Sequence, residues 1–98
     1  MDKEKSKYVI IRTYSAGVFA GELVSRKGKE AKLKNARRLW KWEGAASLSQ
    51  LAQEGTSNPS GCMFPCEVDS VILTEVIEIL SVTEKAKKII KEVNIWRK

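Results

Sequence analysis

The stretch "NARRLWKWEGAASLSQ", residues 35–50, decides how the sheet of this protein is built, because the spacing of apolar residues changes where it begins. In the preceding EAKLK, residues 30–34, the apolar side chains stand at odd positions, whereas Trp40 and Trp42 stand at even positions. A β-bulge at the Asn-Ala pair explains the change, since one extra residue moves the following side chains to the opposite face. We therefore predict a bulged third strand that runs through both tryptophans.

The bulge divides the quoted stretch between two faces of that strand. One face is predicted to carry Ala36, Arg38, Trp40 and Trp42. The other face is predicted to carry Arg37, Leu39 and Lys41. The two adjacent arginines therefore point in opposite directions.

Strand signals on either side of this stretch indicate an antiparallel sheet. Residues 8–13 and 18–25 are rich in β-branched and aromatic side chains, and turn residues at 14–17 and 26–29 join them into a meander. Residues 64–80 return to strand character, with apolar side chains on both parities, which fits one bent strand or two.

Two helices are predicted from their caps and periodicity. Residues 48–54 follow Ser47, an N-cap candidate with a glutamine three positions later, as in a capping box. Residues 84–93 carry an amphipathic stripe and follow two cap candidates, Ser81 and Thr83.

These elements predict one α+β domain over residues 8–98 after a flexible N-terminal tail at 1–7. We expect an antiparallel sheet of about four to six strands, a short internal helix and a C-terminal amphipathic helix. A chain of 98 residues that is 43% apolar has room for one core. Because so small a core gives modest stability, we expect a homo-oligomer.

Charge and hydropathy bound the partners and the location. Residues 26–42 hold eight bases and one acid, residues 43–84 hold seven acids and no base, and residues 85–98 hold six bases and one acid. This alternation suits an anionic ligand at one face, or neutralisation within the fold or between subunits.

No apolar run reaches the ~18–20 residues of a membrane span, and the N-terminus lacks a signal-peptide core. We expect a cytoplasmic protein with no membrane partner.

This composition offers few of the side chains that enzymes commonly use for catalysis. The chain has no histidine, so it lacks the usual general base near neutral pH. Cys62 and Cys66 are spaced C-x3-C, and a zinc site there would require two further ligands. We expect two reduced thiols, no metal, no cofactor and no enzymatic activity.

The quoted stretch offers a ligand-binding site instead. Arg37 and Arg38 can pair with phosphate, and Trp40 or Trp42 can stack on a base. Ser47 opens a helix whose first N–H groups suit an anion. Residues near the first hairpin complete the predicted pocket, namely Tyr14 and Phe19.

A structural role explains the same residues. Two tryptophans on one strand face are often core residues, and the Ser47 and Gln50 side chains can satisfy the helix end themselves. One tryptophan can also fill the core while the other forms the site. Both interpretations remain open from the sequence.

Tyr8 to Trp96, nearly the whole chain, resembles a family of small proteins encoded by tailed bacteriophages and prophages. The distinctive segments are "AGVFAGEL", "NARRLWKWEGAASL" (a NARRxWxWxGAxSL pattern) and the terminal "IW". The resemblance implies a phage or prophage origin and a bacterial cytoplasm, and it carries no catalytic or binding residues to this chain.

A phage origin changes which functions we expect. Small phage proteins without catalytic groups often act by binding a host protein, a nucleic acid or a nucleotide signal. We expect an anti-defence protein that sequesters an anionic nucleotide, such as a cyclic-nucleotide signal. The alternatives are a nucleic-acid-binding protein that uses the basic 26–42 stretch, and an inhibitor of a host enzyme.

Overall fold

Residues 7–38 form three consecutive antiparallel strands in the computed structural model, which describes residues 7–97. These are β1 (Lys7–Thr13), β2 (Val18–Lys27) and β3 (Glu30–Arg38). The third strand is shorter than predicted, since both tryptophans lie beyond its end. The 64–80 segment forms two strands, β4 (Glu67–Leu73) and β5 (Val76–Ser81).

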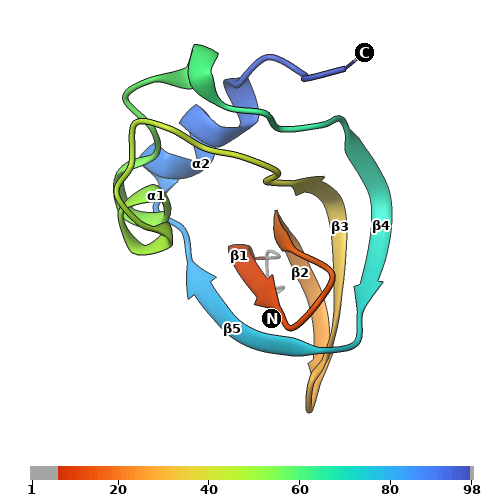
Figure 1. Ribbon diagram of the computed structural model, residues 1–98. Helices are drawn as coiled ribbons and strands as arrows, with labels where there is room; N and C mark the ends of the chain where they lie inside the picture. Colours follow the sequence, from red (N-terminus) through yellow and green to blue (C-terminus); the bar gives the residue numbers. More distant parts are fainter. Residues whose placement is uncertain (1–6, 98) are drawn as a thin grey trace.

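The five described strands form one sheet in the order β4-β3-β2-β1-β5, with every neighbouring pair antiparallel. Only Thr74 and Glu75 separate β4 from β5, although these strands lie at opposite edges of the sheet. The sheet must therefore curve until its edges approach each other, and Figure 1 shows β4 and β5 as two arms of an arc around β1. The predicted α+β fold is confirmed.

Two α-helices lie together beside one end of the curved sheet (Figure 1). They are α1 (Leu48–Glu54) and α2 (Glu84–Glu92), and a short 3-10 turn, η1 (Pro59–Gly61), follows α1. Ser47 caps α1 by accepting a hydrogen bond from Gln50 N, and Thr83 caps α2 by accepting one from Ala86 N. Both helices were predicted because their caps and apolar stripes are local signals.

Successive side chains of β1 belong to two hydrophobic clusters, one on each face of the sheet. Tyr8 and Ile10 pack with the buried residues of α1 and α2, together with Phe64. Val9 and Ile11 pack inside the curve of the sheet, in a cluster that draws on all five strands. Both faces of β1 are therefore buried, as expected for a strand in which apolar residues do not alternate with polar ones.

The predicted β-bulge is present in β3. Ala20 of β2 pairs with Arg37, while Glu22 pairs with Lys34, so β3 has one residue more than β2 between these pairs. Asn35 lies in this interval with φ 51°, the left-handed conformation that asparagine tolerates better than most residues. Arg37 and Arg38 point to opposite sides as neighbours in a strand, and the bulge decides which face each of them takes.

Both ends of the described chain are tied to the domain. Lys7 already belongs to β1, and the rest of the predicted N-terminal tail, residues 1–6, lies outside the described residues. Near the other end, the amide of Trp96 donates to Phe64 O at 3.0 Å, so this segment lies against the body of the domain. Among residues 7–97, no helix combines the length and apolar character that crossing a membrane requires.

Candidate functional site

The chain leaves the sheet directly after Arg38 and forms one wall of a groove. Leu39 N donates to Val18 O at 2.8 Å, which ends the pairing with β2. Two residues later, Lys41 pairs with Met63 as an isolated antiparallel bridge. Residues 39–42 are therefore held in an extended conformation between the start of β2 and the 63–64 segment.

This wall and the first turn enclose a groove of about 350 Å³, which we call the indole groove. It is lined by Ser15, Ala16, Gly17, Val18, Arg38, Leu39, Trp40 and Trp42. Its volume falls within the ~300–1,000 Å³ that is usual for small-molecule sites. Three of the predicted ligand-binding residues therefore meet around one hollow.

Arg38 supplies the positive charge of the indole groove. Its guanidinium lies over the Phe19 ring at 4.4 Å and donates from Nη1 to Ala16 O at 2.5 Å. Within residues 7–97 it forms no ion pair with a carboxylate. Since a guanidinium has five N–H donors, the side chain is held in place while donors remain for an anion.

The two tryptophans have different environments. Trp40 is 64% exposed and lines the groove. Trp42 is half-buried and packs against the cluster beneath the helices. One tryptophan therefore supports the core while the other is available for stacking, a division of roles that the sequence had left open.

Arg37 lies in the interior and does not line the groove. It is only 2% exposed, and its Nε, Nη1 and Nη2 donate to Pro65 O, Ile90 O and Phe64 O at 2.8, 2.9 and 3.0 Å. Burial lowers the pKa of Arg37 from its ordinary value, yet a guanidinium remains charged at neutral pH. The placement corrects our expectation that Arg37 contacts a ligand, because all three nitrogens hold the protein together.

The remaining predicted site residues are dispersed. Phe19 is buried beneath Arg38 and supports its guanidinium. Tyr14 is 79% exposed but lines neither this groove nor the one described next. Ser47 is occupied as the cap of α1. Of these three, only Phe19 lies beside the arginine and tryptophan set.

A second hollow of about 300 Å³ also has Arg38 in its lining, and we call it the apolar groove. It is lined by Phe19, Ala36, Arg38, Pro65, Cys66, Val68, Ser70 and Val71. The sequence did not predict this groove, because residues 65–71 reach Phe19 and Ala36 only through strand pairing. Only the pairing of β4 with β3 could have indicated this groove, and predicting that pairing requires the order of the strands in the sheet.

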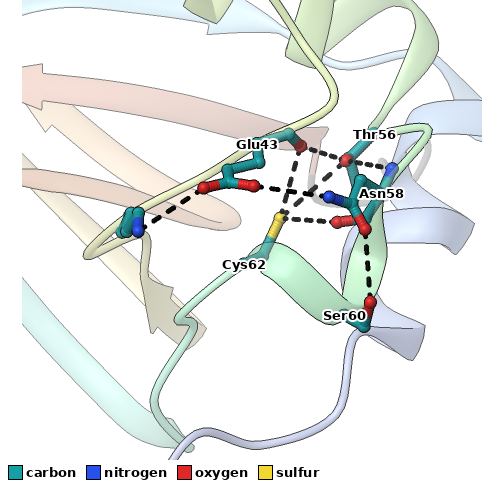
Figure 2. A network of polar contacts seen from close by, with 6 residues as sticks. Glu43, Thr56, Asn58, Ser60 and Cys62 are labelled. Carbon is teal, nitrogen blue, oxygen red and sulfur yellow. Dashed lines mark hydrogen bonds and ion pairs between the residues drawn. The ribbon is translucent and has the colours of Figure 1, made fainter.

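A polar network secures the segment that follows Trp42 (Figure 2). Thr56 Oγ1 donates to Glu43 O and accepts from Asn58 N, and Asn58 Nδ2 donates to Glu43 Oε1 at 3.4 Å. Figure 2 shows these groups pointing toward one another, with the Cys62 thiol among them. The network ties residues 43–44 to the 56–62 loop and so fixes the far end of the groove wall.

The two thiols are free, with Cys62 buried and Cys66 exposed. Among the described residues, no three histidine, cysteine, aspartate or glutamate side chains gather as a metal site would require. Cys62 Sγ lies within hydrogen-bonding distance of Glu43 O at 3.6 Å and Thr56 Oγ1 at 3.8 Å. Its contacts are therefore those of a loop anchor.

The geometry defines a small α+β protein with a curved five-stranded sheet and a surface groove lined by arginine and tryptophan. Residues 6–90 match the model of a family described as a domain of unknown function (DUF6948), and the chain belongs to this family. No curated protein and no solved structure matches the chain.

Proposed function

We propose that this protein is a non-enzymatic accessory protein that binds and sequesters an anionic nucleotide in the indole groove. The observation that carries the proposal is the exposure of Trp40 beside the Arg38 guanidinium. An indole stacks on a base with about 1–3 kcal/mol per base, and a guanidinium pairs with phosphate in a bidentate manner. A base and a phosphate are the two parts of a nucleotide.

The groove residues favour binding over turnover. Their side chains offer one hydroxyl, on Ser15, and no carboxylate or thiol. The resemblance to phage and prophage proteins supports a role in the bacterial cytoplasm against a nucleotide defence signal, such as a cyclic nucleotide. A homo-oligomer would place several such grooves in one particle, which suits a protein that acts by sequestration.

Nucleic-acid binding is the second candidate, because the β2–β3 hairpin is strongly basic. Arg26, Lys27 and Lys29 are exposed at its tip, and Lys32 and Lys34 follow on β3. Clustered lysines neutralise phosphates along a strand and give an affinity that depends strongly on salt. This surface lies on different residues from the indole groove, so variants can separate the two functions.

Nucleotide binding to purified protein tests the first proposal. Titration with mononucleotides and cyclic nucleotides should quench tryptophan fluorescence, since Trp40 becomes stacked. Arg38→Gln should weaken binding about tenfold or more, because a hydrogen bond to a charged group contributes about 1.5–3 kcal/mol. Trp40→Ala should weaken binding at least about fivefold.

Matched controls exist for both substitutions. Arg26→Gln removes the same charge from the exposed hairpin, and Tyr14→Ala removes an exposed aromatic side chain outside the groove. Both should retain wild-type affinity. The proposal fails if no nucleotide binds, or if the control variants lose as much affinity as the groove variants.

Native mass spectrometry of protein from infected cells would report bound cargo and subunit number together, whereas capture of one host protein would favour an inhibitor.

A further inference from the structure

Arg38 borders two hollows at once. It lines the indole groove together with Trp40 and lines the apolar groove together with Pro65 and Val68. The guanidinium lies over the Phe19 ring, 4.4 Å from its centroid, and Phe19 also lines the apolar groove. One cation therefore lines two pockets of similar size, about 350 and 300 Å³.

The apolar groove has mostly apolar walls. Pro65, Val68 and Val71 supply apolar walls, while Cys66 and Ser70 supply the only polar side chains besides Arg38. No carboxylate lines it, so an anion held at Arg38 would meet no repulsion from this side. Predominantly apolar walls with a few polar groups are the usual composition of a small-molecule pocket.

We propose that the apolar groove is a second base-binding subsite, so that the natural ligand is a dinucleotide whose bridging phosphate lies at Arg38. One base stacks on Trp40 in the indole groove, and the other enters the apolar groove against Pro65 and Val68. This inference rests on the proposed function and extends it from nucleotides in general to dinucleotides.

The order of chemical groups along the ligand supports this assignment. A dinucleotide joins its two bases through a phosphodiester, and the protein has two grooves that share one guanidinium. A mononucleotide fills only one groove. Occupying both within one molecule makes the second contact intramolecular, which raises affinity without a further entropy cost of association.

The experiment compares three probes, namely AMP, the linear diadenylate pApA and cyclic di-AMP, by calorimetric titration. At least one dinucleotide should bind at least about tenfold more tightly than AMP, and the comparison between pApA and cyclic di-AMP reports whether the ligand is linear or cyclic. Cys66→Trp fills the apolar groove from an exposed position, and Cys66→Ser is its matched control. The tryptophan variant should reduce dinucleotide affinity to that of AMP and leave AMP binding unchanged.

Alkylation of Cys66 gives a second readout that does not require a variant. Cys66 is exposed and Cys62 is buried, so N-ethylmaleimide should modify Cys66 first in the native protein. A saturating dinucleotide should slow this modification at least about fivefold, whereas saturating AMP should leave the rate unchanged.

The possible outcomes separate the two proposals. If AMP binds in a Trp40-dependent manner but neither dinucleotide gains affinity or protects Cys66, the second subsite is wrong and the indole groove stands. If neither class of ligand binds, both proposals are wrong. Loss of AMP binding in Cys66→Trp would also overturn the inference, because the two grooves would not be separate subsites.

Discussion

Arg37 and Arg38 are adjacent in the sequence but differ in what holds them. The guanidinium of Arg37 joins β3 to the 64–65 segment and to Ile90 in the last turn of α2. The last carbonyls of a helix carry partial negative charge, so a cation there is favourable even without a carboxylate partner. The exposed side chain of Arg38 instead donates to Ala16 O and lies over the Phe19 ring.

Arg37→Met should therefore destabilise the protein by about 3 kcal/mol or more, because three buried carbonyls lose a charged donor. Arg38→Met should cost less than about 1 kcal/mol, since its guanidinium is exposed to water, where a cation–π contact contributes about 0.5–1 kcal/mol. Urea denaturation monitored by circular dichroism measures both. Equal destabilisation by the two substitutions would contradict the division between structural and binding roles.

Tyr8 is a buried residue whose hydroxyl has no hydrogen-bond partner within the described residues. Burial raises the pKa of Tyr8 above its ordinary value of 10.0, and the charges of Glu67 and Glu22 raise it further while that of Arg37 lowers it. The folded state therefore keeps the proton after the unfolded state has lost it. The resulting stability is fully present below about pH 10 and is lost as pH rises from there toward the folded pKa.

Comparison of wild type with Tyr8→Phe isolates this effect. At pH 8 the variant should be at least as stable as wild type, because no hydrogen bond is removed. Between pH 8 and pH 11 the wild type should lose about 1 kcal/mol relative to the variant, since one unit of pKa corresponds to about 1.4 kcal/mol. Urea titrations at both pH values measure this, and a difference that does not change with pH would contradict the burial of the phenol.

At the scale of elements, the loop after α1 depends on a close approach at Gly44. A Cβ atom there would overlap Thr56 Oγ1, which donates to Glu43 O, and Asn58 N, which donates to Thr56 Oγ1 (Figure 2). The φ of +82° also disfavours any residue with a side chain. Both constraints act on the segment that carries Trp42, so packing in the 56–62 loop affects the shape of the indole groove.

Gly44→Ala should lower the free energy of unfolding by about 3 kcal/mol or more, because left-handed strain of about 1–2 kcal/mol adds to the steric overlap. Gly28→Ala is the matched control, since Gly28 also has positive φ but no atom lies within 4 Å of the position that a Cβ would occupy. It should cost only the strain of about 1–2 kcal/mol. Chemical denaturation of both variants tests the difference, and equal losses would show that the close approach contributes nothing.

Local signals predicted the elements better than the site. The 48–54 helix follows from its cap and stripe, and the β3 bulge follows from a change of parity within a few residues. The exposure of Trp40 and the burial of Arg37 depend on residues 63–65 and on α2, which are distant in sequence. The alternation of side chains along a strand places the two arginines on opposite sides, but it does not show which side is the interior.

At the scale of the whole molecule, the basic runs are divided between the β2–β3 hairpin and α2. None of the three ion pairs within residues 7–97 uses a base from residues 26–34. The acidic residues of the middle segment therefore leave this hairpin unneutralised by direct contact. A basic surface of this kind attracts anions over a Debye length of about 8–10 Å, whether or not they finally bind in the groove.

Salt dependence distinguishes attraction by this surface from binding in the groove. A nucleotide held by one or two charges should lose about tenfold or less in affinity between 50 and 200 mM salt, whereas a polynucleotide that contacts six or more phosphates would lose about a thousandfold. Replacing the hairpin lysines with glutamine, at positions 27, 29, 32 and 34, should leave nucleotide affinity within about threefold of wild type. Isothermal titration at both salt concentrations measures these values, with Arg38→Gln as the comparison. Steep salt dependence together with loss of binding in the lysine variant would assign the function to the hairpin instead, since only multiple phosphate contacts release enough counterions to produce it.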